Sequence, residues 1–437
     1  MSNNKVPEKV IAVGVVLPDQ TRRVAEEHID ELEKLIESAG GTVVAKVLAK
    51  RNAPDAATWI GSGKAEEIKR LATNAHAALI VFDDDLSPAQ TRNLERITDV
   101  KVIDRSALIL DIFARRARSR EARTQVELAQ LEYMLPRLTR QWSHLERQAG
   151  GIGTRGVGET QLEIDRRIVR NRISQLKGDL EKIERTRETQ RKSRGAAFTV
   201  ALVGYTNAGK STLFNRLTGG NALAVDKLFA TLDAKSQRTC FAMPRQTVII
   251  DTVGFVRKLP HHLVASFRST MEEAVAADLV LHVIDGSHPQ YEEQRIVGEE
   301  VLRSLGIPAE RVIDVYNKTD LVDGFRGLEV SRSRGSGNRE TAQPRGRATA
   351  ISALSGHGLE RLVDAIRDRE LAGGEILDLE IPHEQSRVLA KLHGFAEVYE
   401  ERSDDQTTRV TAWVPRNAVH QFEKFSATNL LKRAKVS

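Results

Sequence analysis

The sequence predicts a multidomain α/β protein. Two stretches, near residues 10–104 and 198–369, alternate short apolar runs with amphipathic ones. Between them, two series of apolar residues recur every three or four positions, which is typical of paired helices. We therefore expect an N-terminal α/β domain at 1–110, a basic helical hairpin with a glycine-rich tip loop at 111–195, a doubly wound α/β domain at 196–370 and a small α+β domain at 371–437.

The composition fits a folded protein of the cytoplasm. Of 437 residues, 40% are hydrophobic and 29% are charged, so ordinary cores can form. The sequence contains no apolar run of about 18 residues, and we expect no stable membrane insertion. The first residues lack the apolar segment of a secretory signal. A single cysteine, Cys240, excludes an internal disulfide framework and a thiolate zinc site.

The N-terminal domain reads as alternating strands and helices. Apolar runs predict strands at 10–17, 41–48 and 77–82, and amphipathic stretches predict helices at 24–38 and 65–74. Inside this domain, Gly61-Ser62-Gly63-Lys64 resembles the end of a phosphate-binding loop but lacks the upstream glycine and the following hydroxyl residue. We favour a plain strand-to-helix turn, with a second nucleotide site as the alternative.

The hairpin follows from two apolar seams. The first comprises Leu128, Leu131, Leu135, Leu138, Trp142 and Leu145, and the second comprises Leu162, Val169, Ile173, Leu176, Leu180 and Ile183. One loop with five glycines, at 150–158, joins them, so we expect an antiparallel pair. Pro136 should kink the first arm or restart it.

The positive charge is concentrated in this hairpin. The chain has 66 Lys and Arg against 60 Asp and Glu, a net charge of +6, but residues 111–195 alone hold 20 against 12. A glycine-rich tip that carries Arg155 on basic arms suits contact with a phosphate-rich surface. Simple helix packing with a solvated basic face is the alternative.

The strongest motif follows a predicted strand at 198–203. Residues 204–211, GYTNAGKS, fit G-x-x-x-x-G-K-[ST], and a helix should begin at Thr212. Backbone N–H groups of such a loop hold phosphates, Lys210 reaches the β- and γ-phosphates, and the Ser211 hydroxyl can ligate Mg²⁺. The nucleotide contacts predicted here are Gly204, Tyr205, Thr206, Asn207, Ala208, Gly209, Lys210, Ser211 and Thr212.

Two further motifs stand at predicted strand ends. After the apolar run 248–250 comes Asp251-Thr252-Val253-Gly254, in which Asp251 should hold a water ligand of Mg²⁺ and the Gly254 N–H should face the γ-phosphate. After the run 312–316 comes Asn317-Lys318-Thr319-Asp320. An aspartate there accepts two hydrogen bonds from guanine, and adenine offers neither donor. Ser352-Ala353-Leu354 should supply a backbone contact to the guanine oxygen.

These motifs in order predict a P-loop GTPase domain that binds GTP or GDP with Mg²⁺. The threonine that caps Mg²⁺ should be Thr231, within Phe229-Ala230-Thr231-Leu232-Asp233, all of which we expect at the nucleotide; Thr239 is the competitor. The predicted catalytic residues are Lys210, Thr231 and Gly254, and the predicted metal ligands are Ser211 and Thr231.

Phe255 stands where related GTPases often carry a water-orienting glutamine. A phenyl ring neither donates nor accepts, so the isolated protein should hydrolyse GTP slowly until a partner orders the site. The alternative is that another nearby side chain positions the water.

Three phrases give the chain its resemblance to a known family. Phe-Ala-Thr-Leu-Asp at 229–233, Asp-Thr-Val-Gly-Phe at 251–255 and GGIGTRGVGETQLEIDRR at 150–167 resemble the HflX family of translational GTPases. The resemblance implies a cytoplasmic enzyme that binds the large ribosomal subunit and its rRNA, points its hairpin tip towards the peptidyl-transferase region, and splits or rescues stalled or inactive ribosomes. The sequence departs from the family pattern chiefly in an Arg/Gly/Ser-rich loop at 324–347.

Two other functions stay open from the sequence. The protein could be an ATP-dependent RNA-remodelling enzyme that uses its N-terminal region, or a GTP-gated RNA-binding scaffold in ribosome assembly. For the ribosome-binding protein, we expect a monomer away from the ribosome.

Overall fold

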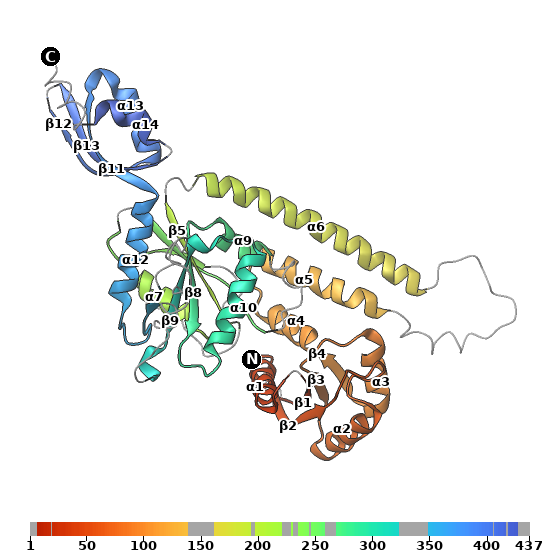
Figure 1. The fold of residues 1–437 in the computed structure, drawn as a ribbon. Helices are drawn as coiled ribbons and strands as arrows, with labels where there is room; N and C mark the ends of the chain where they lie inside the picture. Colours follow the sequence, from red (N-terminus) through yellow and green to blue (C-terminus); the bar gives the residue numbers. More distant parts are fainter. Residues whose placement is uncertain are drawn as a thin grey trace, which may run out of the picture. The chain divides into compact units, whose positions relative to one another are not determined.

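A computed structural model gives the fold (Figure 1), and its described residues form two compact units. Unit 1 lies within residues 1–184, 226–233 and 257–268, and unit 2 within 185–225, 234–256 and 269–437. The structure describes residues 7–18, 20–138, 161–193, 197–220, 229, 235–243, 246–257, 268–322, 348–404, 406–416 and 418–426. The hairpin tip at 150–158 and the loop at 324–347 lie outside these ranges. The four-domain division stays a prediction.

The N-terminal part of unit 1 is a parallel sheet flanked by helices, as the alternating pattern predicts. The sheet has the order β2-β1-β3-β4. Its elements are β1 (Glu8–Val16), α1 (Arg22–Ser38), β2 (Gly41–Lys50), α2 (Ser62–Ala75), β3 (Leu79–Phe82), α3 (Pro88–Thr98), β4 (Lys101–Asp104) and α4 (Arg105–Arg116). Apolar side chains such as Ile11, Val13, Ile80 and Phe82 are buried between sheet and helices, because both faces of a parallel sheet are covered.

The helical arms are α5 (Arg120–Met134), which continues into the 3-10 helix η1 (Leu135–Leu138), and α6 (Gln161–Ser193). Figure 1 shows α5 and α6 running in opposite directions, which confirms the antiparallel hairpin. Pro136 lies in η1, after the end of α5 at Met134. A restart of the first arm after residue 138 would lie outside the described residues, so the predicted kink or restart stays a prediction. Of the predicted seam, Leu128 and Leu176 are buried, and the ion pairs Arg172–Glu127 and Lys177–Glu132 connect the arms at 2.7 and 2.9 Å.

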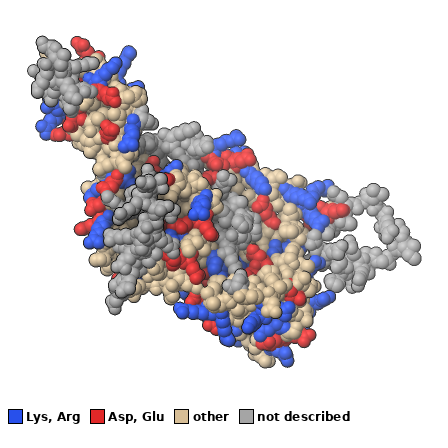
Figure 2. Space-filling model, viewed as in Figure 1, with Lys and Arg blue, Asp and Glu red and all other residues tan. Residues whose placement is uncertain are grey.

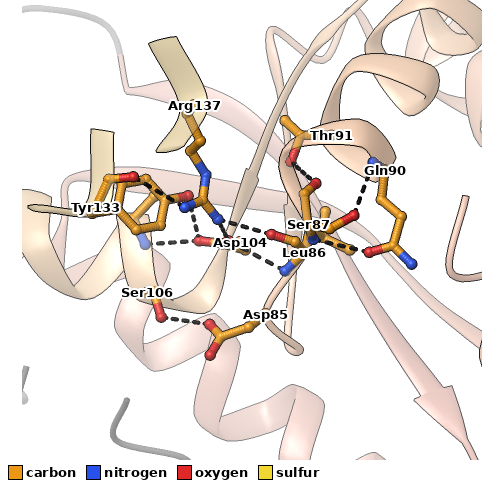
Figure 3. Close-up of polar contacts among 10 residues, drawn as sticks. Asp85, Leu86, Ser87, Gln90, Thr91, Asp104, Ser106, Tyr133 and Arg137 are labelled. Atoms are coloured by element: carbon orange, nitrogen blue, oxygen red, sulfur yellow. Dashed lines mark hydrogen bonds and ion pairs between the residues drawn. The ribbon is translucent and has the colours of Figure 1, made fainter. Parts of the chain in front are cut away.

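The first arm is fixed to the sheet at Asp104 (Figure 3). The Tyr133 hydroxyl donates to one carboxylate oxygen of Asp104 at 2.8 Å, and Arg137 donates to the other at 2.8 Å. The guanidinium of Arg137 also lies over the Tyr133 ring, 3.5 Å from its centroid. Asp104 is fully buried and caps α4, and this burial raises the pKa of its carboxyl group. The root of the hairpin is therefore held by a buried polar network.

Unit 2 contains a six-stranded sheet with the order β10-β9-β8-β5-β7-β6, in which only β6 pairs antiparallel. Its elements are β5 (Phe198–Gly204), α7 (Lys210–Thr218), β6 (Lys235–Arg238), β7 (Thr247–Asp251), α9 (Arg268–Ala276), β8 (Leu279–Asp285), α10 (Tyr291–Ser304), η2 (Ala309–Arg311), β9 (Val312–Asn317), η3 (Thr319–Leu321), β10 (Thr349–Ala350) and α12 (Leu359–Ala372). Helices lie on both faces of the sheet (Figure 1), so the doubly wound prediction is confirmed.

The C-terminal part is the predicted small α+β unit. Its antiparallel sheet has the order β11-β13-β12. The elements are β11 (Gly374–Pro382), η4 (His383–Gln385), α13 (Ser386–Phe395), β12 (Glu397–Ser403), β13 (Thr407–Pro415), α14 (Val419–Phe422) and η5 (Glu423–Phe425). Among the described helices, none has the length and apolar character needed to cross a bilayer.

Candidate guanine-nucleotide site

The sequence motifs of unit 2 meet at one edge of its sheet. Gly204 ends β5, Asp251 ends β7 and Asn317 ends β9, and these strands are parallel. In open α/β sheets, ligands bind outside the carboxyl ends of the strands, where the strand order reverses. β5 lies at this point, between β7 and β8. The fold therefore brings the predicted residues to the edge of the sheet where such folds bind ligands.

The loop after β5 has the shape that a phosphate-binding loop requires. Gly209, at the start of α7, has a φ of +88°, and a Cβ there would lie 2.2 Å from the Asn317 side-chain nitrogen. Only glycine tolerates this combination of dihedral and contact. The amides that follow form the N-terminus of α7, where anions are favoured. Tyr205, Thr206 and Ala208 are buried, Asn207 is exposed, and Ser211 and Thr212 are half-buried.

Lys210 is buried against the loop that precedes it. Its side chain is 6% exposed, and its Nζ donates to the carbonyls of Gly204 and Tyr205 at 3.0 and 2.7 Å. Burial lowers the pKa of Lys210 to about 8, although the nearby carboxylate of Asp251 acts in the opposite direction. The ammonium group is therefore poorly hydrated. Phosphate oxygens bound in this loop would replace the hydrogen bonds to water that burial removes.

Ser211 and Asp251 provide the oxygens that a magnesium ion prefers. The Ser211 hydroxyl donates to a carboxylate oxygen of Asp251 at 2.8 Å, and Asp251 is 1% exposed. A hydroxyl and a carboxylate at this separation fit Mg²⁺, which takes hard oxygen ligands and keeps several waters. The residues present therefore fit the ion, and the roles of Ser211 as a direct ligand and of Asp251 as the holder of a water ligand stay predictions.

Gly254 approaches the phosphate-binding loop closely. A Cβ on Gly254 would lie 2.8 Å from the Thr206 Cα and 2.9 Å from the Lys210 Nζ. By contrast, the Thr252 hydroxyl is fully buried and donates to the Leu202 carbonyl at 2.6 Å, and Val253 is 3% exposed. The side chains of Thr252 and Val253 are thus packed inside the domain, and the backbone of Gly254 lies beside Lys210.

Phe255 is buried, and its backbone pairs with the phosphate-binding loop. Its side chain is 1% exposed, its N–H donates to the Gly204 carbonyl at 2.9 Å, and its carbonyl accepts from the Thr206 N–H at 2.7 Å. Phe255 thus continues the parallel pairing of β5 and β7 past the ends of these strands, next to the phosphate-binding loop. This placement agrees with the expectation that Phe255 cannot replace a glutamine.

The base-recognition motif is organised around Asn317. Its side-chain nitrogen donates to the Ala208 carbonyl at 2.8 Å and its oxygen accepts from the Ala353 N–H at 2.9 Å, so one buried side chain joins the phosphate loop to the loop after β10. Asp320, in η3, is exposed and thus accessible to a base. Thr319 donates its hydroxyl to the Ile351 carbonyl at 2.9 Å.

Within the predicted segment Ser352-Ala353-Leu354, one residue is exposed. Ser352 is fully buried and its hydroxyl accepts from the Ser355 N–H, whereas Leu354 is 71% exposed. The structure therefore brings Asn317, Asp320 and Ala353 to the same end of the sheet, as the motif order predicts.

Sequence reasoning missed two supporting residues. Asp285 ends β8 and forms an ion pair with Lys318 at 2.7 Å, which fixes the lysine stem of the base-recognition motif. An aspartate at a strand end was the signal that could have revealed it. Arg216 donates to the Ala353 carbonyl at 3.0 Å and to that of Leu354. Nothing in the sequence around Arg216 marks this contact.

The predicted threonine segment is described only at Phe229, which belongs to unit 1. Its side chain is 3% exposed and packs on Phe113. Ala230, Thr231, Leu232 and Asp233 lie outside the described residues, so their roles stay predictions. The hydroxyl of Thr239, the alternative candidate, donates to the Leu217 carbonyl at 2.7 Å, so this hydroxyl already has a partner at the end of α7.

Comparison with known proteins places the chain in a family. Three family models match it: "GTP-binding GTPase N-terminal" at residues 26–114, "GTP-binding GTPase Middle Region" at 116–194 and "50S ribosome-binding GTPase" at 199–318. GTPase HflX of Caldanaerobacter subterraneus subsp. tengcongensis is 44% identical over 96% of this chain and 94% of its own. The chain belongs to the HflX family of GTPases.

A further HflX relative and a solved structure are also similar to this chain over most of its length. GTPase HflX of Escherichia coli K12 is 44% identical, with 84% of each chain covered. A crystal structure of a GTP-binding protein from Sulfolobus solfataricus with GDP is 25% identical and covers 83% of this chain and 98% of its own, at a TM-score of 0.43. As an HflX-family GTPase, the protein hydrolyses GTP, and the P-loop domain of unit 2 carries this reaction.

Proposed function

We propose that the protein, with GTP and Mg²⁺ bound, attaches to the large ribosomal subunit, splits stalled or inactive ribosomes, and is released after GTP hydrolysis. The observation that carries this proposal is the match of residues 199–318 to the family model described as a 50S ribosome-binding GTPase. Hydrolysis of GTP then serves as a switch, since loss of the γ-phosphate removes the contacts that order the loops around it.

The residues of unit 2 have separate tasks in this reaction. The N-terminus of α7 and Lys210 hold the phosphates, Asp320 selects guanine, and Gly254 brings a backbone N–H towards the γ-phosphate. Ser211 would hold Mg²⁺ directly and Asp251 would hold it through a water, and the bound ion would supply positive charge beside the phosphates. Thr231 is proposed as a second metal ligand. Because Phe255 is buried, we propose that contact with the large subunit supplies the order that hydrolysis needs.

The helical arms support contact with RNA. The helix α6 carries ten Lys and Arg against six Asp and Glu, and Arg167 and Arg170 are exposed on it. Figure 2 shows blue and red side chains interspersed along this helix. Electrostatic attraction to phosphates is strong for basic surfaces and decreases with salt. We propose that the arms carry the tip at 150–158 to the rRNA.

A ribosome-splitting assay tests this function. Dissociation of whole ribosomes, followed by light scattering, should occur with wild-type protein and a nonhydrolysable GTP analogue. A variant with a shortened loop at 150–158 should bind GTP normally and split ribosomes far more slowly. Equal splitting by the shortened variant would remove the tip from the mechanism, and absence of splitting by the wild type would favour the scaffold alternative.

A second nucleotide site in unit 1 is less well supported. Gly61-Ser62-Gly63-Lys64 lies at the start of α2 beside a cavity of about 410 Å³, whose lining includes Lys50 and Arg51. However, Lys64 forms an ion pair with Glu67 at 2.8 Å, within the first turns of the helix. The local geometry agrees with the plain strand-to-helix turn.

A further inference from the structure

The helix α7 connects the two ends of the guanine-nucleotide site. Its first residue, Lys210, lies in the phosphate-binding loop, and Arg216 lies in its last turn. Arg216 follows Lys210 by six positions, which is about 9 Å along the helix axis. From there the exposed side chain of Arg216 reaches the loop after β10. One helix therefore joins the phosphate-binding loop to the segment expected beside the guanine base.

The guanidinium of Arg216 holds two successive backbone carbonyls. Its Nε donates to the Ala353 carbonyl at 3.0 Å, and a terminal nitrogen donates to the Leu354 carbonyl. A guanidinium can hold two acceptors at once because its donors form a rigid, planar fork, whereas an ammonium is a point charge. The two contacts therefore fix the orientation of the peptide group between Ala353 and Leu354.

The N–H groups on either side of Leu354 already have acceptors inside the domain. The Ala353 N–H donates to the Asn317 side-chain oxygen at 2.9 Å, and the Ser355 N–H donates to the Ser352 hydroxyl at 3.1 Å. By contrast, no acceptor for the Leu354 N–H is found in the part of the chain that the structure describes. Leu354 is also 71% exposed. Its N–H is therefore available to a ligand.

The peptide group between Ala353 and Leu354 links this N–H to Arg216. The C=O and N–H of a trans peptide point in opposite directions, and the described residues contain no cis peptide. Because the Ala353 carbonyl faces Arg216, the Leu354 N–H points away from Arg216. A cation at the carbonyl also polarises the peptide, which strengthens the hydrogen bond that the N–H can donate. Arg216 thus controls both the direction and the strength of this donor.

We propose that Arg216 is a positioning residue for base recognition, which directs the Leu354 N–H to the O6 oxygen of guanine through the peptide group after Ala353. The proposal rests on the proposed role of Asp320, which accepts from the N1–H and 2-amino group of the same base. Adenine carries an amino group in place of O6. An N–H directed there would face a second donor, so this contact opposes the binding of ATP.

Equilibrium binding of GTP, 6-thio-GTP and ITP to full-length protein tests this role. In 6-thio-GTP a sulfur, a weaker acceptor, replaces O6, whereas ITP keeps O6 and lacks the 2-amino group. The wild type should prefer GTP over 6-thio-GTP about fivefold, the size expected for one hydrogen bond. In Arg216→Ala this preference should fall below about twofold through weaker GTP binding. The preference for GTP over ITP and the kcat at saturating GTP should stay unchanged.

Two further variants serve as control and as rescue. Arg311, in η2, also donates to two carbonyls, those of Val275 and Ala277, at 3.2 and 3.3 Å. It lies before the first residue of β9, at the opposite end of this strand from Asn317. Arg311→Ala should therefore leave all three affinities unchanged. Arg216→Lys keeps the charge without the fork, so it should restore part of the preference for GTP over 6-thio-GTP.

Each role fails on a different result. An unchanged preference for GTP over 6-thio-GTP in cooperatively unfolding Arg216→Ala protein would overturn the role of Arg216, as would absence of this preference in the wild type. An equal loss of the preference for GTP over ITP would also overturn it, because the effect would not be specific to O6. The role of Asp320 is tested separately: Asp320→Asn should abolish the preference for GTP over ITP, and a retained preference would refute the proposed base recognition. Ribosomes are absent from these assays, so the results are independent of ribosome splitting.

Discussion

Raising the pH from 7 to 9 should weaken GTP binding through Lys210. Burial lowers the pKa of this lysine to about 8, well below its usual range, because the charged form loses hydration in the phosphate-binding loop. The charged form is the one that attracts phosphate oxygens. Deprotonation therefore removes the attraction as the pH rises through 8.

The size of the effect follows from the pKa. The charged fraction of Lys210 falls from about nine-tenths at pH 7 to about one-tenth at pH 9, so the Kd for GTP should rise about tenfold. The shift of the Lys210 pKa from its usual value corresponds to a free-energy cost of about 3 kcal/mol for the charged form in the nucleotide-free protein. Phosphate charge offsets this cost when the nucleotide binds.

Equilibrium titration of a fluorescent GTP analogue at pH 7, 8 and 9 measures the effect. The matched control is Lys210→Arg, because the guanidinium keeps its charge throughout this range and reports every other titrating group. If wild-type protein and Lys210→Arg showed the same pH profile, the buried-lysine explanation would be wrong.

Three further substitutions test the geometry of the site and of the hairpin root. Gly254→Ala should lower the hydrolysis rate about tenfold or more, because its methyl group meets the Thr206 Cα at 2.8 Å; unchanged steady-state turnover would contradict the close approach. Asn317→Ala should lower the free energy of unfolding in urea by about 2–3 kcal/mol, because two buried backbone groups lose their partner; a loss below about 0.5 kcal/mol would refute this role. Tyr133→Phe should cost about 1 kcal/mol of stability through the lost bond to Asp104, with GTP affinity unchanged; weaker GTP binding would connect the hairpin root to the site.

The sequence predicted the features that depend on local pattern. The strands and the doubly wound sheet follow from apolar periodicity, and the structure confirms them. The P-loop residues could also be predicted from the sequence, because the motif indicates the positions where the backbone requires glycine. Lys210, Ser211 and Asp251 lie together as the spacing indicates.

What the sequence could not predict are contacts between residues far apart in the chain. Arg105 and Arg257 are separated by 152 positions, and Phe113 and Phe229 lie on segments with no shared motif. Periodicity indicates which face of a helix is buried, but it does not identify the partner of a buried charge. For the same reason the contacts of Arg216 with the loop after β10 were missed.

The central claim is that this is a guanine-specific switch that hydrolyses GTP slowly until the large ribosomal subunit completes its site. Steady-state hydrolysis of GTP and ATP, measured with and without purified large subunits, tests it most directly. We predict slow GTP hydrolysis by the isolated protein, stimulation of about tenfold or more at saturating subunits, and no comparable hydrolysis of ATP. Equal GTP hydrolysis with and without subunits, or ATP hydrolysis that persists in Asp320→Asn, would contradict it.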